Sequence, residues 1–104
     1  MSRLEKLESL LQEAPTDSFI LFAIAKEYEK MDSFTQAIEY YEKVRSNDAY
    51  YVGVYYHLGN AWAELDQKDK AIEIFKKGIE ICKTLGDQHA LSELKSVLMN
   101  IEIE

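Results

Sequence analysis

Hydrophobic residues recur along the chain at steps of three and four positions, which is the spacing of one face of an α-helix. The first clear segment carries Leu21, Ile24, Ala25 and Tyr28, and it ends at the polar pair 32–33. Three further segments keep the same spacing: Ala37, Ile38, Tyr41 and Val44; then Tyr55, Leu58, Gly59 and Trp62; then Ala71, Ile72, Phe75 and Gly78. With only four glycines and one proline, the connections must be short. The pattern predicts an all-α fold.

The helical segments belong to an internal repeat of 34 residues, because that shift lays residues 18–51 onto residues 52–85. Five pairs are then identical: Asp32/Asp66, Ala37/Ala71, Ile38/Ile72, Glu39/Glu73 and Lys43/Lys77. Other pairs keep their size class: Ile24/Leu58, Ala25/Gly59, Tyr28/Trp62, Met31/Leu65 and Tyr41/Phe75. The sequence therefore predicts two copies of one helical hairpin.

Small residues stand at equivalent places in both copies, at positions 25, 37, 59 and 71. Two helices approach each other closely only where the facing side chain is a methyl group or a hydrogen. Large residues at 28, 41, 62 and 75 then fill the space beside each close contact.

This arrangement resembles the tetratricopeptide repeat. The second copy matches the family pattern closely, with Tyr55-x2-Leu58-Gly59-x2-Trp62 followed by Ala71-x3-Phe75. The first copy is a conservative variant, with Leu21-x2-Ile24-Ala25-x2-Tyr28 and Ala37-x3-Tyr41. The family's proline near the repeat end is replaced by Ala49 and Lys83, and it appears one unit earlier as Pro15. The resemblance implies a right-handed superhelix of antiparallel helix hairpins with about six helices, and a role in binding other proteins.

The two ends of the chain complete the expected domain. Leu7 and Leu10 fall 34 residues before Tyr41 and Val44, so Arg3–Glu13 resembles the second helix of a repeat. Beyond the second copy, one apolar stripe predicts a capping helix: Ala90, Leu91, Leu94, Val97, Leu98 and Ile101. Gly86 and Asp87 precede it as a helix-ending glycine and an N-cap. We expect one domain over residues 1–104: a half-repeat helix at 2–14, repeats at 18–51 and 52–85, and a cap at 87–102.

The chain is acidic, and its negative charge is evenly spread along the sequence. The net charge is −7, with −3 over residues 1–34, −2 over 35–68 and −2 over 69–104. Nucleic acid and anionic membranes are therefore not expected as partners. The N-terminus lacks the apolar core of a signal peptide, and no apolar run approaches the roughly 20 residues that span a bilayer. We expect a cytoplasmic protein.

In the family, the first helix of each repeat lines a concave groove that holds ligand peptides. Carried onto this sequence, the groove face passes through seven residues: Phe19, Phe22, Lys26, Gly53, Tyr56, His57 and Asn60. Ala23 shares the face, and Tyr50 and Tyr51 are expected to pack at the turn between the repeats. Phe22 and Tyr56 would anchor an apolar side chain, and Lys26 and Asn60 would bind its backbone or a carboxylate. The alternative is that the terminal helices fold across this face and bury it as core.

The family subtype that clamps a C-terminal carboxylate is disfavoured. Phe22 stands where that subtype has a lysine, and no third groove helix supplies the remaining cations. A different role is self-association as a homodimer through the terminal helices, where Leu4, Leu7, Leu10 and Leu11 form an apolar edge.

Catalysis is not expected, nor is a cofactor or metal. His57 and His89 have no metal-binding spacing to the other candidate ligands, and the glycines form no phosphate-binding loop. Cys82 is the only cysteine, which excludes an intramolecular disulfide. We interpret it as a structural thiol inside a helix.

Overall fold

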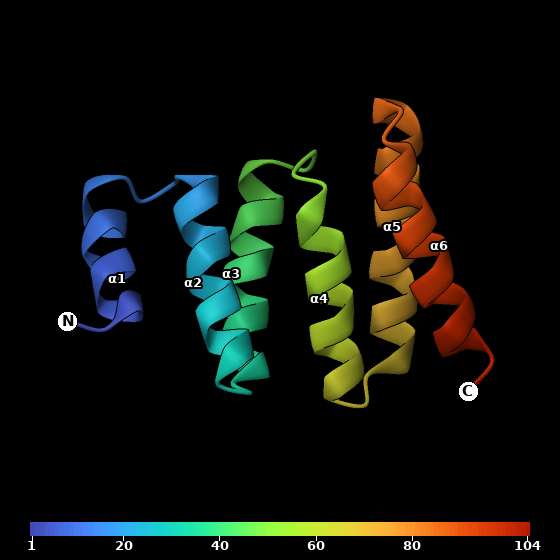
Figure 1. Ribbon diagram of the computed structural model, residues 1–104, viewed down its shortest axis with the longest axis horizontal. Coiled ribbons are helices and arrows are strands. Elements are labelled where there is room, and N and C mark those ends of the chain that lie inside the picture. The colour runs from blue at the N-terminus through green and yellow to red at the C-terminus, as the bar shows by residue number, and fades with distance from the viewer. The chain divides into compact units, whose positions relative to one another are not determined.

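The computed structural model describes residues 1–104 and contains six helices and no strands (Figure 1). The helices are α1 (Arg3–Glu13), α2 (Ser18–Lys30), α3 (Phe34–Asn47), α4 (Gly53–Glu64), α5 (Lys68–Leu85) and α6 (Gln88–Glu102). The prediction of an all-α fold with about six helices is confirmed. None of the helices combines the length and the apolar character that crossing a membrane requires.

Side chains at the helix starts explain where three of the helices begin. The Ser2 hydroxyl accepts from the Glu5 backbone N–H at 3.1 Å, and the Glu5 carboxylate accepts from the Ser2 N–H at 3.0 Å, which completes a capping box for α1. The Asp17 carboxylate caps α2 by accepting from the Ile20 N–H at 3.1 Å. Asp87 caps α6 in the same way, through the Ala90 N–H. These bonds satisfy backbone donors that a helix leaves unpaired at its first turn.

Left-handed backbone conformations end three helices. Asp32 has a φ of 56° and Asp66 a φ of 58°, so the two aspartates that the repeat aligns have the same backbone conformation. Aspartate tolerates this conformation better than most residues do. Gly86 ends α5 with a φ of 73°, and the predicted glycine stop followed by the Asp87 cap is confirmed.

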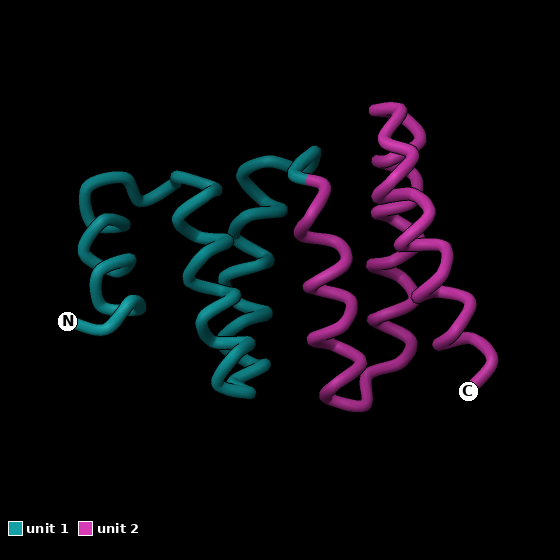
Figure 2. Tube along the Cα trace, in the orientation of Figure 1, with its two compact units in different colours: residues 1–51 teal, residues 52–104 magenta.

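The chain divides into two compact units, residues 1–51 and residues 52–104 (Figure 2). The division falls at the junction between the two copies of the repeat. Unit 1 holds α1, α2 and α3, and unit 2 holds α4, α5 and α6.

The core of unit 1 forms between three helices. Leu7 of α1 packs with Ala23 and Ile24 of α2 in one cluster. Five partly buried side chains surround that cluster: Leu4, Leu11, Ile20, Tyr28 and Tyr40. Tyr41 of α3 is fully buried and donates from its hydroxyl to the Glu29 carboxylate at 2.8 Å. Burial and this hydrogen bond raise the pKa of Tyr41 well above its usual value.

The core of unit 2 depends on two glycines that let helices approach. A Cβ atom at Gly59 would lie 2.3 Å from the Phe75 ring, so the buried ring occupies the space a side chain would need. A Cβ atom at Gly78 would lie 2.6 Å from the Cβ of Tyr55 and 2.9 Å from Leu94. Gly59, one of the four small positions that the sequence singles out, therefore marks a close helix contact as predicted, and Gly78 marks a second one that the sequence did not single out.

The capping helix α6 buries the stripe that the sequence assigns to it. Leu91, Leu94 and Ile101 are buried. The other three members, Ala90, Val97 and Leu98, are half-buried. The opposite face carries exposed polar residues, including Glu93, Lys95 and Ser96.

Candidate functional site

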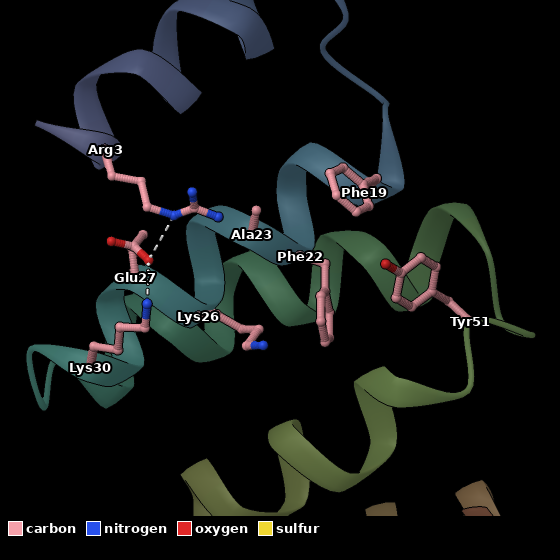
Figure 3. A pocket seen from close by; sticks show the side chains of 8 residues that line it. All are labelled: Arg3, Phe19, Phe22, Ala23, Lys26, Glu27, Lys30 and Tyr51. Carbon is pink, nitrogen blue, oxygen red and sulfur yellow. Dashed lines mark hydrogen bonds and ion pairs between the residues drawn. The ribbon is translucent and has the colours of Figure 1, made fainter.

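A pocket of about 200 Å³ opens on the face of α2 in unit 1 (Figure 3). Eight residues line it: Arg3 from α1; Phe19, Phe22, Ala23, Lys26, Glu27 and Lys30 from α2; and Tyr51 from the segment after α3. Positions 19, 22, 23, 26, 27 and 30 follow steps of three and four, so they form one stripe along the helix. We refer to this feature as the α2 pocket.

Aromatic rings form one wall of the α2 pocket. The Phe22 ring lies 5.1 Å from the Tyr51 ring and 5.6 Å from the Tyr41 ring, both at tilted angles. These separations and tilts are typical of favourable aromatic pairs. Phe22 and Tyr51 are half-buried, whereas Phe19 is 71% exposed at the mouth. The wall is therefore a fixed apolar surface with one ring projecting into solvent.

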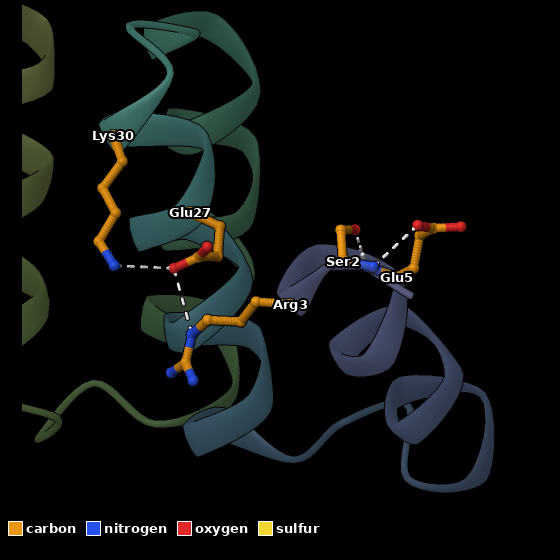
Figure 4. A network of polar contacts seen from close by, with 5 residues as sticks. All are labelled: Ser2, Arg3, Glu5, Glu27 and Lys30. Carbon is orange, nitrogen blue, oxygen red and sulfur yellow. Dashed lines mark hydrogen bonds and ion pairs between the residues drawn. The ribbon is translucent and has the colours of Figure 1, made fainter.

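Three cations, one carboxylate and Ala23 form the rest of the α2 pocket. The Glu27 carboxylate accepts from Lys30 Nζ at 3.0 Å and from Arg3 Nε at 3.2 Å, and both bonds go to the same oxygen (Figure 4). The hydrogen bond from Lys30 is the main cause that lowers the pKa of Glu27, with the charges of Lys30 and Arg3 adding to it. Lys26 lies apart from this pair, with its ammonium 5.7 Å from the centre of the Phe22 ring.

The predicted groove residues of α4 lie in unit 2. Gly53 is exposed in the first turn of the helix, and Asn60 is half-buried. The Tyr56 and His57 rings meet edge to face, with their centres 5.7 Å apart. Tyr56 is 37% exposed and borders an open hollow whose other lining residues belong to α6: Ser92, Glu93, Ser96, Val97 and Asn100. The capping helix therefore flanks Tyr56 without covering it.

The structure thus brings Phe19, Phe22 and Lys26 together at one pocket, and their role in partner binding stays a prediction. Ala23, which the sequence places on the same face, is buried against Leu7 and Ile24 as part of the core. The N-terminal helix reaches the face through Arg3 and yet leaves Phe19 exposed.

Sequence reasoning missed Arg3, Glu27, Lys30 and Tyr51 as lining residues. The spacing of Glu27 and Lys30, three residues apart on one helix, was a usable signal for their ion pair. Arg3 lies 24 residues before Glu27, and no local pattern indicates that contact. Tyr51 contacts Phe22 within unit 1, in addition to its predicted place at the turn.

The remaining candidates for chemistry occupy ordinary structural positions. Cys82 is buried in α5, and burial, together with the charge of Asp87, raises the pKa of its thiol. A raised pKa leaves little of the reactive thiolate at neutral pH. His89 lies 3.3 Å from Glu93 on the exposed surface of α6.

Known proteins share both the sequence pattern and the fold. The tetratricopeptide repeat model matches residues 20–49 and 52–85. A tetratricopeptide repeat domain protein from Salinibacter ruber is 39% identical, with 85% of this chain and 89% of that chain covered and a TM-score of 0.79.

More distant structures share the fold. One is the TPR2B domain of yeast Sti1 in its pHsp70 complex, at 17% identity and a TM-score of 0.89, covering 95% of this chain and 79% of that one. Another is PcrH in complex with the chaperone-binding region of PopD, at 12% identity and a TM-score of 0.89, covering 96% of this chain and 76% of that one. No curated protein matches the sequence. Because the repeat model covers more than half of the chain and a bacterial relative is 39% identical over most of its length, the chain belongs to the tetratricopeptide repeat family.

Proposed function

We propose that this protein is a non-catalytic interaction module that binds a peptide or helix of a partner protein. The observation that carries the proposal is the α2 pocket, where Phe19 is 71% exposed beside the fixed ring of Phe22 and the ammonium of Lys26. Exposed aromatic groups next to polar donors are typical of the residues that dominate protein interfaces. The α4 residues Tyr56, His57 and Asn60, with the gap at Gly53, are proposed as a further contact surface of unit 2.

Two structural neighbours support a role of this kind. The TPR2B domain of Sti1 is described in a complex with pHsp70, and PcrH in a complex with a segment of PopD. The likeness to both concerns the fold, so the partner of this chain must be found from its own residues. Those residues favour binding over chemistry, since the single thiol is buried with a raised pKa.

The test is partner capture with surface variants of the intact protein. Phe19→Ala is the informative substitution because its ring is largely solvent-exposed, so its removal costs little stability. Phe22→Ala is less informative, since the half-buried Phe22 ring packs on Tyr41 and Tyr51. Tyr50→Ala is the matched control: this ring is 56% exposed and lies outside the α2 pocket.

Proteins bound from the native cell extract are compared for the wild type and for each variant. We expect Phe19→Ala, alone or with Tyr56→Ala, to lose partners that Tyr50→Ala retains. Phe19→Ala by itself should keep the thermal midpoint of the wild type. Equal capture by the wild type and the Phe19→Ala/Tyr56→Ala double variant would remove both surfaces as binding sites.

A second candidate function is self-association through the terminal helices. The observation that favours it is the exposure of apolar side chains there, with Leu10 of α1 50% exposed and Met99 of α6 60% exposed. Two copies that pair over these faces would form a homodimer. Light scattering behind a sizing column tests this, and a monomer mass at every concentration would exclude it.

A further inference from the structure

The α2 pocket is positively charged, although the chain as a whole is acidic. Its lining contains three cationic side chains, Arg3, Lys26 and Lys30, and one carboxylate, Glu27, a formal surplus of two positive charges. The chain as a whole carries a net charge of −7. A cationic pocket on an acidic molecule attracts an anionic group and disfavours a basic one.

The three cations differ in what they contact. Arg3 and Lys30 both bind one oxygen of Glu27, at 3.2 and 3.0 Å, and that carboxylate neutralises part of their charge. Lys26 lies over the Phe22 ring, 5.7 Å from its centre, and takes no part in the ion pairs of Glu27. A ring holds a cation only by the weak attraction of its face, which leaves the ammonium's hydrogen-bond donors to other acceptors.

We propose that the α2 pocket binds an acidic internal segment of the partner protein. A carboxylate side chain of that segment binds the Lys26 ammonium, and a large apolar side chain next to it packs on Phe19 and Phe22. This inference rests on the proposed function, because it names the chemistry of the ligand for the same site.

The arrangement fits a side-chain carboxylate better than the end of a chain. Capture of a C-terminal carboxylate relies on several donors that converge on both of its oxygens. Here Arg3 and Lys30 already share Glu27, so Lys26 is the one cation of the pocket that forms no ion pair with Glu27. A single ammonium beside an apolar wall matches one glutamate or aspartate adjoining a hydrophobic residue.

Glu27 affects the binding of an acidic ligand in two ways. It fixes Arg3 and Lys30 in place (Figure 4), and its own charge opposes the approach of an acidic ligand. Removing that charge with Glu27→Gln therefore strengthens the binding of acidic peptides, whereas a neutral peptide gains nothing. A variant that binds acidic peptides more tightly cannot have lost its structure, so this gain separates electrostatic recognition from misfolding.

The experiment is a selection of random peptides, displayed within a loop so that no chain end is offered, on the wild-type protein and on two variants. Lys26→Met removes the ammonium and keeps the apolar stem. Lys43→Met is the matched control, because Lys43 also lies over a ring, 4.6 Å from the centre of Tyr40, and is not part of the α2 pocket. Thermal unfolding of all three proteins checks that they are equally folded.

We expect the wild type and Lys43→Met to enrich peptides with aspartate or glutamate next to a large apolar residue. Lys26→Met should lose that preference, with the affinity for a synthesised acidic peptide lowered about fivefold at low salt, as for an exposed ion pair. Glutamine in place of the glutamate in that peptide should have a similar effect, and added salt should weaken the wild-type binding.

Several outcomes would overturn the proposal: enrichment of neutral or basic peptides, no enrichment, or an equal loss in both lysine variants. If a peptide with a free C-terminal carboxylate binds more tightly than the same peptide with a C-terminal amide, the ligand is the end of a chain and not an internal segment. If the mass of the wild-type protein in solution rises with concentration and Lys26→Met abolishes that rise, the occupant of the pocket is a second copy of this chain. Native partner capture that depends on Phe19 and is indifferent to Lys26 would leave the proposed function standing and remove the acidic segment alone.

Discussion

The close contact at Gly78 allows a quantitative prediction. Replacing this glycine by alanine adds one methyl group inside α5, a change that raises intrinsic helix stability by about 1 kcal/mol at a solvent-exposed position. At Gly78, the new carbon would lie 2.6 Å from the Cβ of Tyr55 and 2.9 Å from Leu94. Carbon atoms in contact normally lie about 3.5–4.0 Å apart.

The contact with Tyr55 decides the sign of the effect. Leu94 meets the new carbon with a terminal methyl group, which rotates away at small cost. The Cβ of Tyr55 is fixed to the α4 backbone and its ring is buried, so α4 and α5 must separate by about 1 Å. Overpacking of this kind costs about 1–3 kcal/mol. A contact about 1 Å too short between two buried helices lies in the upper half of that range, about 2–3 kcal/mol. After the helix gain, Gly78→Ala should therefore lower the free energy of unfolding by about 1–2 kcal/mol.

The assay is urea and thermal unfolding followed by far-ultraviolet circular dichroism. For a domain of this size, the expected loss lowers the thermal midpoint by roughly 5–15 °C. Lys76→Ala is the control, because it makes an alanine at an exposed position of the same helix and should shift the free energy by less than about 0.5 kcal/mol. An unchanged or raised midpoint for Gly78→Ala would show that the helices separate without cost and would refute the steric reasoning.

Three further measurements test other parts of the structure. Asp66 has a φ of 58°, which suits glycine and strains a branched side chain. Asp66→Gly should therefore raise the free energy of unfolding by up to about 1 kcal/mol, and Asp66→Val should lower it by about 1–2 kcal/mol. Equal urea midpoints for the two variants would contradict this reasoning. Stability should fall as pH rises above about 10, the ordinary tyrosine pKa, because the raised pKa of buried Tyr41 keeps its proton in the folded state while the unfolded chain releases it. Urea titrations should show a shallower fall for Tyr41→Phe, and the same fall in both proteins would argue against Tyr41 as a source. Cys82 should react slowly with a thiol reagent in the native protein and fast in urea, by mass spectrometry, and equal rates would show that the thiol is accessible.

The sequence by itself determined the helices and their buried faces. The spacing of apolar residues places Leu21, Ile24, Tyr41 and Val44 in the core, and all four are buried. This works because a helix repeats every 3.6 residues, so the periodicity of the side chains encodes its inward face. Helix ends were also readable where a local rule governs them, as at Gly86 and Asp87.

Tertiary structure alone decided how the candidate site is built. The sequence placed Phe19, Phe22 and Lys26 on one helical stripe, and it gave no sign that Arg3 would meet Glu27 from α1 or that Tyr51 would lie against Phe22. Such contacts depend on how far one helix rotates and slides on its neighbour, which the packing of many side chains fixes together. Local periodicity states which face of a helix is buried. Six of the eight residues that line the α2 pocket come from α2 itself, and the tertiary structure adds Arg3 and Tyr51 from segments that are distant in sequence.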